Sequence, residues 1–229
     1  MEAPPRKLTW SVWAGLLLTL ALLGLAFVLS KLSARPAAAG RLPVYAQVTP
    51  FSLTNQLAQP ITLATLRGHV WIADIIFTRC PGPCLRMTRQ MAELQAQLPS
   101  DPRLKLISLT TDPDFDTPEV LRRYGEKIGV RSEQWWFLTG AKPELARLAV
   151  DGLKFTAVEK KPEERENPAD LFIHSTIFAL VDKHGRLRGV FETQPAQEAD
   201  SDVPPDSEKQ WKANKARILA AVGRLLAEE

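Results

Sequence analysis

The sequence predicts an α/β fold in which a mixed central sheet is flanked by helices. Residues 70–77 form a near-continuous apolar run, which is typical of a central strand buried on both faces. Strand and helix patterns alternate after this run, and a final pair of strand patterns is followed by one more helix. With 229 residues, the chain is long enough for one ordinary domain with a sizeable core and an appendage.

The individual elements follow from apolar periodicity and from local start and stop signals. Strands are expected at 51–53, 61–63, 70–77, 104–109, 135–138, 153–158, 175–181 and 187–191. Helices are expected at 85–98, 118–128 and 143–150, and over a last amphipathic stretch that contains Trp211 and Ile218. Thr117 suits the N-cap of the second helix and Pro118 its first position. This order fits a thioredoxin-like layout, with a mobile loop expected over the charged residues 159–170.

The first forty residues predict a membrane attachment. Residues 8–29 carry no charge, and at 1.5 Å per residue these ~22 residues would span a hydrocarbon core of ~30 Å. We therefore expect a short cytoplasmic tail at 1–7, a transmembrane anchor at 8–30, a linker at 31–43 and the globular domain at 44–229. This predicts a single-pass protein of the cytoplasmic membrane with its domain on the periplasmic or extracytoplasmic side. The alternative is a cleaved signal peptide, because residues 37–40 offer small side chains to a signal peptidase.

The charge balance argues against nucleic acid as a partner. Lys and Arg number 29 against 26 Asp and Glu, which gives a formal net charge of +3. The two signs are interspersed, without the basic stripe that follows a phosphate backbone. Much of the basic excess flanks the apolar N-terminal stretch, which again points to a membrane.

The two cysteines of the chain are Cys80 and Cys84, with Pro81, Gly82 and Pro83 between them. A domain of this size needs no disulfide staple, so a close pair in an exported protein indicates redox or metal chemistry. We expect the pair after the central strand and at the start of a helix. There the helix dipole and nearby arginines should lower the thiol pKa. A structural disulfide is the alternative.

Two thiolates are soft ligands that suit Cu(I), and one imidazole would complete a site that also accepts Cu(II). Of the three histidines, His174 is the candidate ligand. In a thioredoxin-like sheet the loop that enters its strand faces the cysteine loop. His69 and His184 are expected to be structural, and Met87 and Met91 to pack in the core.

Several ordered motifs carry a family resemblance. They are the segment from Phe77 through Cys84; Thr111-Asp112-Pro113 with Asp116-Thr117-Pro118 and Tyr124; Trp136 through Gly140; and His174-Ser175 with Leu180-Val181-Asp182 and Gly185. Together they resemble the SCO/SenC family, the copper chaperones named for synthesis of cytochrome c oxidase. The resemblance implies a thioredoxin-like fold, an N-terminal membrane helix, and copper held by Cys80, Cys84 and His174.

The chain departs from the family pattern at three places. Leu85 stands where the family usually has proline, which should alter only the helix start. Ile173 stands where the family often has an aspartate before its histidine, so Asp170 or a backbone carbonyl is expected to support the His174 ring. The 159–170 loop is unusually charged.

The function expected from these residues is that of a copper metallochaperone rather than an enzyme. It would deliver Cu(I) or Cu(II) to the copper-A subunit of cytochrome c oxidase, and would need a copper donor and a thiol reductant. The alternative is a thiol:disulfide oxidoreductase that reduces the cysteines of the oxidase copper site. A redox-signalling tether is a third class.

Overall fold

A computed structural model describes residues 10–33, 41–80, 82–155, 157–159, 172–174, 176–193 and 207–228. The chain divides into two units, Met1–Arg41 and Leu42–Glu229. The predicted loop at 159–170 lies outside the described residues, apart from Glu159.

The first unit contains helix α1 (Trp10–Ser33), which begins close to the apolar stretch expected from the sequence. The side chains described in it, at 13–25, are all exposed. Among the residues that the structure describes, no helix is both long and apolar enough to cross a membrane. The expected anchor at 8–30 and linker at 31–43 extend beyond the described residues, so both stay predictions.

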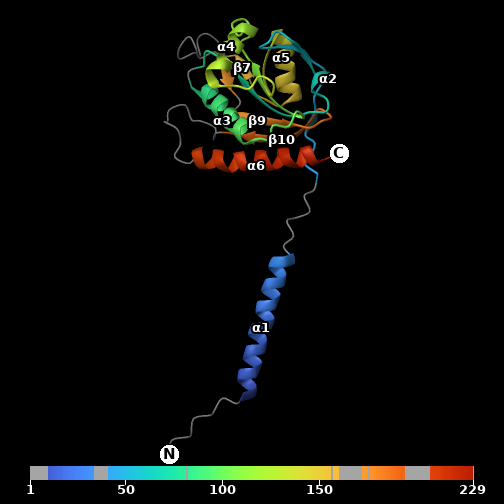
Figure 1. The fold of residues 1–229 in the computed structure, drawn as a ribbon, viewed down its shortest axis with the longest axis vertical. Helices are drawn as coiled ribbons and strands as arrows, with labels where there is room; N and C mark the ends of the chain where they lie inside the picture. Colours follow the sequence, from blue (N-terminus) through green and yellow to red (C-terminus); the bar gives the residue numbers. More distant parts are fainter. Residues whose placement is uncertain are drawn as a thin grey trace, which may run out of the picture. The chain divides into compact units, whose positions relative to one another are not determined.

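The second unit is built on an eight-stranded sheet with the order β1-β10-β9-β4-β5-β6-β2-β3. Figure 1 shows β9 and β10 of this sheet side by side. Its strands are β1 (Ala46–Gln47), β2 (Ser52–Asn55), β3 (Pro60–Thr62), β4 (Val70–Ile76), β5 (Leu104–Thr110), β6 (Trp135–Thr139), β9 (Ile177–Val181) and β10 (Arg186–Glu192). The pairs β4–β5 and β5–β6 are parallel and the remaining pairs are antiparallel. The mixed central sheet expected from the sequence is therefore confirmed. A separate pair is formed by β7 (Ala157–Glu159) and β8 (Phe172–His174).

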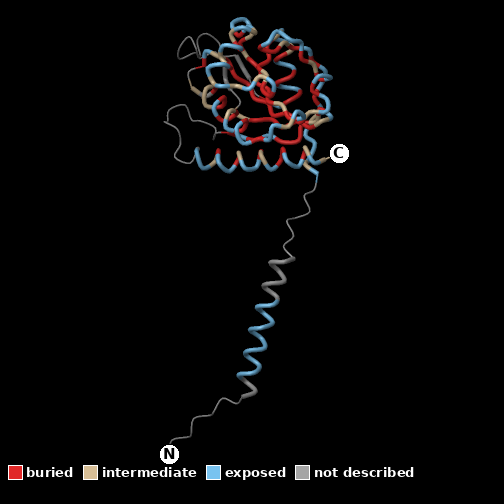
Figure 2. Tube along the Cα trace, in the orientation of Figure 1, coloured by how far each residue is buried: buried red, intermediate tan, exposed pale blue. Residues whose placement is uncertain are grey.

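Helices cover both faces of the sheet. One apolar cluster joins the sheet to α3 (Pro83–Gln97), α4 (Pro118–Ile128) and α6 (Ser207–Ala227). A second cluster joins the other face to α2 (Leu63–Leu66), α5 (Lys142–Arg147) and a π-helical turn at Leu148–Gly152. Strand β4 contributes to both clusters because successive side chains point to opposite faces. Ile72 and Ile76 face the first cluster, and Trp71 and Ile75 face the second. The buried residues accordingly gather along the middle of the unit (Figure 2).

Two short segments differ from the predicted elements. The strand expected at 61–63 ends at Thr62, because the Thr62 hydroxyl accepts the Thr65 amide at 3.1 Å and caps helix α2. The strand expected at 153–158 is mostly wrong, since only the short β7 forms there. Leu153 and Phe155 are buried, but their amides donate to the carbonyls of Leu148 and Ala149 in the preceding π-helical turn rather than to a neighbouring strand. Apolar character alone did not distinguish burial in a strand from burial in a segment that follows a helical turn.

A buried ion-pair network ties both ends of the second unit to the sheet. The Arg188 side chain is 2% exposed and reaches Asp182 at 2.7 Å and Glu228 at 3.0 Å. It also donates to the carbonyl of Leu42 at 2.7 Å. Burial alone would raise the pKa of Asp182, but the hydrogen bonds from Arg188 and Arg186 outweigh it and hold this pKa below its usual value. The first residues of the unit, the β9–β10 turn and the end of α6 thus share one guanidinium.

We predict that Arg188→Met lowers the free energy of unfolding by about 3–5 kcal/mol, because it leaves two carboxylates without their buried partner. The control is Arg122→Met, whose exposed pair with Glu126 should contribute less than about 0.5 kcal/mol. Urea denaturation of both variants measures the difference. Equal losses would contradict the assignment of Arg188 as a central tie.

Candidate metal centre

The two cysteines lie where the sequence predicted them. Strand β4 ends at Ile76, Cys80 follows in the loop, and Cys84 is the second residue of α3. Both are buried, with 9% of Cys80 and 1% of Cys84 exposed, and neither forms a disulfide. The Cys84 amide donates to the Cys80 sulfur at 3.5 Å, so the helix start holds the first cysteine beside the second. Pro83 begins the helix without loss of a needed donor.

The residues just before Cys80 are fixed by the loop between β5 and α4. Arg79 pairs with Asp112 at 2.5 Å, and its guanidinium lies 4.3 Å from the centre of the Phe115 ring. Thr78 donates through its amide and its hydroxyl to the carboxylate of Asp116. Asp112 and Asp116 belong to motifs that the sequence singled out, but their attachment to the cysteine loop was not predicted.

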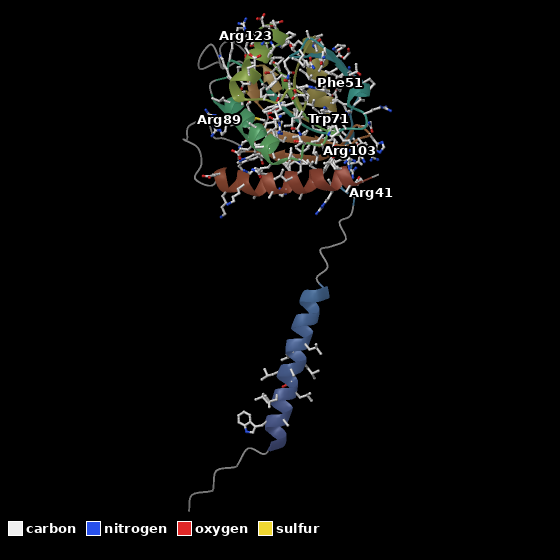
Figure 3. All side chains as sticks on the ribbon, viewed as in Figure 1. Arg41, Phe51, Trp71, Arg89, Arg103 and Arg123 are labelled. Atoms are coloured by element: carbon white, nitrogen blue, oxygen red, sulfur yellow. The ribbon has the colours of Figure 1, made fainter. Side chains whose placement is uncertain are left out.

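The electrostatics of the pair differ from the expectation. The hydrogen bond with Cys80 is the largest cause that raises the pKa of Cys84, followed by burial and by the negative charge that Cys80 carries as a thiolate. The prediction that the helix start and nearby arginines lower the pKa of this thiol is therefore wrong. Arg79 is committed to Asp112, and Arg89 is an exposed side chain on the surface of the unit (Figure 3).

Asp74 is another buried acidic residue near the thiols. It is fully buried in β4, and neither carboxyl oxygen has a hydrogen-bond partner among the described residues. Burial raises the pKa of Asp74 to about 7, and the nearby Ser108 hydroxyl offsets only part of that effect. Its charge in turn contributes to the raised pKa of Cys84. The sequence signal was available, because Asp74 is the one charged residue within the apolar run 70–77.

Two hydroxyl groups continue this buried polar region. Thr88 donates to the Cys84 carbonyl at 2.8 Å and lies 2.9 Å from the Tyr124 hydroxyl. Burial is the largest cause that raises the pKa of Tyr124 to about 12, and the charges of Cys84 and Asp74 add to it. Met87 and Met91 are buried in the apolar cluster under α3, which confirms the expected packing role.

His174 was expected at the entry to the strand at 175–181, and it is the last residue of the short strand β8, where its backbone pairs with Ala157 of β7. Its side chain is outside the described ones, and Asp170, its expected support, lies outside the described residues altogether. Among the side chains that the structure describes, no three His, Cys, Asp or Glu residues are grouped closely enough to hold a metal ion.

The other two histidines lie away from the cysteines. His69 directly precedes β4, and His184 is exposed in the turn between β9 and β10. The Gly68 amide donates to the Lys183 carbonyl at 2.9 Å, so both histidines are at the edge of the sheet where β4 begins. Cys80 follows the opposite end of β4. The seven residues of this strand span roughly 20 Å, so the two histidines lie far from the cysteines.

Known proteins share this fold and sequence. Residues 41–202 match the family profile described as SCO1/SenC. The chain is 35% identical to the SCO1 protein homolog of Bacillus subtilis over 167 residues, covering 70% of this chain and 83% of the relative. A candidate copper-binding protein of Stutzerimonas stutzeri is 34% identical over 152 residues, which are 65% of this chain and 70% of that protein.

A solved structure gives the same answer for the fold. BsSco, a member of the Sco family of cytochrome c oxidase assembly proteins with a disulfide switch, is 28% identical. Its TM-score is 0.56, and the match covers 76% of this chain and 98% of that chain. The thioredoxin-like fold expected from the sequence is thereby confirmed.

Asp74 generates a prediction about pH. Its pKa in the folded protein, about 7, lies above the usual 3.8, so the folded state binds this proton more tightly than the unfolded state. The associated stability is present below the unfolded pKa and is lost as the pH rises through about 7. Asp74→Asn removes this proton, so its stability relative to the wild type should rise by up to about 4 kcal/mol between pH 4 and pH 8.

Urea denaturation of the reduced, copper-free proteins at several pH values measures this difference. The exposed Asp114→Asn is the control and should follow the wild-type profile. Parallel profiles for the wild type and Asp74→Asn would show that Asp74 does not hold a proton in the folded state.

Proposed function

The chain belongs to the SCO1/SenC family, and we propose that it is a copper metallochaperone that delivers copper to the copper-A subunit of cytochrome c oxidase during assembly. One observation carries the proposal: Cys80 and Cys84 are unbridged, buried and in contact at the start of a helix. Two adjacent sulfurs in an apolar cluster suit a soft ion such as Cu(I). The Stutzerimonas relative and the assembly role of BsSco support copper and an oxidase partner.

We propose His174 as the third ligand because of the sheet register. In the antiparallel pair of β4 and β9, Trp71 lies opposite Val181 and Ala73 opposite Ala179. Strand β9 therefore begins at the edge of the sheet where β4 ends. Cys80 comes four residues after β4, and His174 comes three residues before β9, so both approach this edge. His69 and His184 belong to the opposite edge.

The buried thiols also determine how copper would be taken up. A metal binds the thiolate and not the thiol, so binding must release the proton that the raised pKa keeps on Cys84. Copper affinity should consequently rise with pH until this proton is lost. Transfer to a partner would exchange ligands one at a time. Cys80, the more exposed of the two residues, is placed to meet the incoming ligand first.

The second candidate function is a thiol:disulfide oxidoreductase that reduces the cysteines of the oxidase copper site. The hydrogen bond between the two cysteine side chains favours it, as does the disulfide switch of BsSco. In either function we propose that residues 8–30 anchor the chain in the cytoplasmic membrane with the domain on the extracytoplasmic side. A copper donor and a thiol reductant would be the further partners.

The ligand set predicts the outcome of an anaerobic copper titration of the full chain. Cys80→Ser and Cys84→Ser should each abolish tight binding of one equivalent of Cu(I), because one thiolate and one imidazole leave a poorly organised site. His174→Ala should weaken Cu(II) more than Cu(I), since two thiolates alone can hold Cu(I). His184→Ala is the matched control and should bind both ions like the wild type. An unchanged Cu(II) spectrum in His174→Ala would remove His174 from the ligand set.

Copper binding should also depend on the redox state of the pair. Oxidation by a small-molecule disulfide joins the two sulfurs, releases their two protons and transfers two electrons, which yields two small-molecule thiols. The oxidised chain keeps one imidazole of the proposed set and should bind no copper tightly. Mass spectrometry should show the loss of two protons, and a thiol reductant should restore one equivalent. Tight copper binding by the verified disulfide form would contradict the proposed site.

A further inference from the structure

We propose that Asp116 is a positioning residue for the cysteine pair, because its buried carboxylate holds Thr78 and thereby sets the approach of Cys80 to Cys84. The inference rests on the proposed function only in assuming that the thiols of Cys80 and Cys84 are the reactive groups. It adds a residue that neither the ligand set nor the exchange chemistry requires.

Asp116 reaches the cysteine loop from the adjacent β5–α4 loop. Its residue is fully buried. The Oδ2 atom accepts the Thr78 amide at 3.1 Å and the Thr110 hydroxyl at 2.5 Å, and the Oδ1 atom accepts the Thr78 hydroxyl. One carboxylate therefore joins the end of β5 to the segment that leads into Cys80.

The hydrogen bonds of Asp116 begin where those of the sheet stop. The parallel ladder of β4 and β5 ends with Ile76 opposite Thr110, and the Thr111 amide donates to the Ile76 carbonyl at 2.9 Å. Thr78 is two residues beyond the strand and two residues before Cys80. The Asp116 carboxylate takes over the role of a neighbouring strand at this point, because it accepts the backbone amide that a ladder would otherwise satisfy.

The cost of the arrangement argues for a role beyond stability. A buried carboxylate loses its hydration, and burial is the largest cause that raises the pKa of Asp116 despite the three hydrogen bonds. Such hydrogen bonds to a charged acceptor are short and directional, which suits the fixing of geometry better than the gain of stability. On the outer side, Arg79 is held by Asp112 of the same loop. The two residues before Cys80, Thr78 and Arg79, are thus both attached to the β5–α4 loop.

A matched pair of substitutions separates positioning from simple stability. Thr78→Val and Thr110→Val each remove one hydroxyl from the same carboxylate with little change in volume. Thr110 also accepts the Asp112 amide at 3.0 Å, so its loss is the larger perturbation of the loop. Only Thr78 leads directly into Cys80. A role in stability alone predicts the greater effect for Thr110→Val, whereas positioning predicts it for Thr78→Val.

The experiment measures the dithiol–disulfide equilibrium of the full chain in buffers of reduced and oxidised glutathione, together with the urea unfolding of each variant. Loss of the attachment makes closure of the Cys80–Cys84 bridge less preorganised. Asp116→Asn should therefore lower the equilibrium constant for disulfide formation by about tenfold, and Thr78→Val by several-fold. The equilibrium constant of Thr110→Val should stay within about twofold of the wild-type value, although this variant should lose at least as much stability as Thr78→Val.

The Cu(II)–thiolate absorption band gives a second readout, which should shift in Thr78→Val and not in Thr110→Val. Equal disulfide equilibria and spectra for the two valine variants would overturn the inference. This comparison holds even if Asp116→Asn fails to fold. If the wild-type chain binds no copper but Thr78→Val still changes the disulfide equilibrium, the proposed function is overturned and the positioning role remains.

Discussion

The seven-residue parallel pairing of β4 with β5 is the constraint on which the site depends. Val70 lies opposite Leu104 and Ile76 opposite Thr110, so both strands end at the same edge of the sheet. The loops that follow them leave side by side, one with Cys80 and the other with Asp116. A slip of one residue in this register would exchange the faces that the two strands share. It would also separate Asp116 from Thr78, because that hydrogen bond spans the ends of the two strands.

The same burial that stabilises the sheet sets the chemistry of its edge. Cys80 and Cys84 belong to the apolar cluster under α3, and Asp74 lies within the same buried layer. The hydrogen bond with Cys80 and removal from water raise the pKa of Cys84, and removal from water raises that of Asp74. The reduced pair thus retains the proton of Cys84, which a metal ion or a disulfide bond must displace. A surface thiolate activated by arginines would behave in the opposite way.

The fold separates its strongest ionic tie from its reactive groups. Arg188, Asp182 and Glu228 meet near the β9–β10 turn, at the edge of the sheet where β4 begins. The cysteines lie beyond the other end of β4. The network can therefore fix the first residues of the unit and the end of α6 without adding charge near the thiols. The proposed metal centre at Cys80 and Cys84 therefore lies in buried surroundings, which soft ligands favour.

The sequence by itself determined the class of fold and the location of the cysteine pair. The apolar run 70–77, the cap at Thr117 and the turn after Val181 are local signals, because strand burial, helix capping and tight turns depend on neighbouring residues. The family profile agrees with the motifs that first indicated SCO/SenC. The role of His174 was reached from those motifs and from the order of the strands, and it remains a prediction.

Tertiary structure decided the properties that depend on contacts between distant residues. The pKa of Cys84 was predicted to fall, but the hydrogen bond with Cys80 and burial raise it. Arg79 is neutralised by Asp112, 33 residues away in the chain, and Thr78 is held by Asp116, 38 residues away. No local pattern encodes such pairings, since they exist only once two parallel strands have aligned their ends. The sequence could therefore place the thiols, whereas the packing around them decided how they are charged and held.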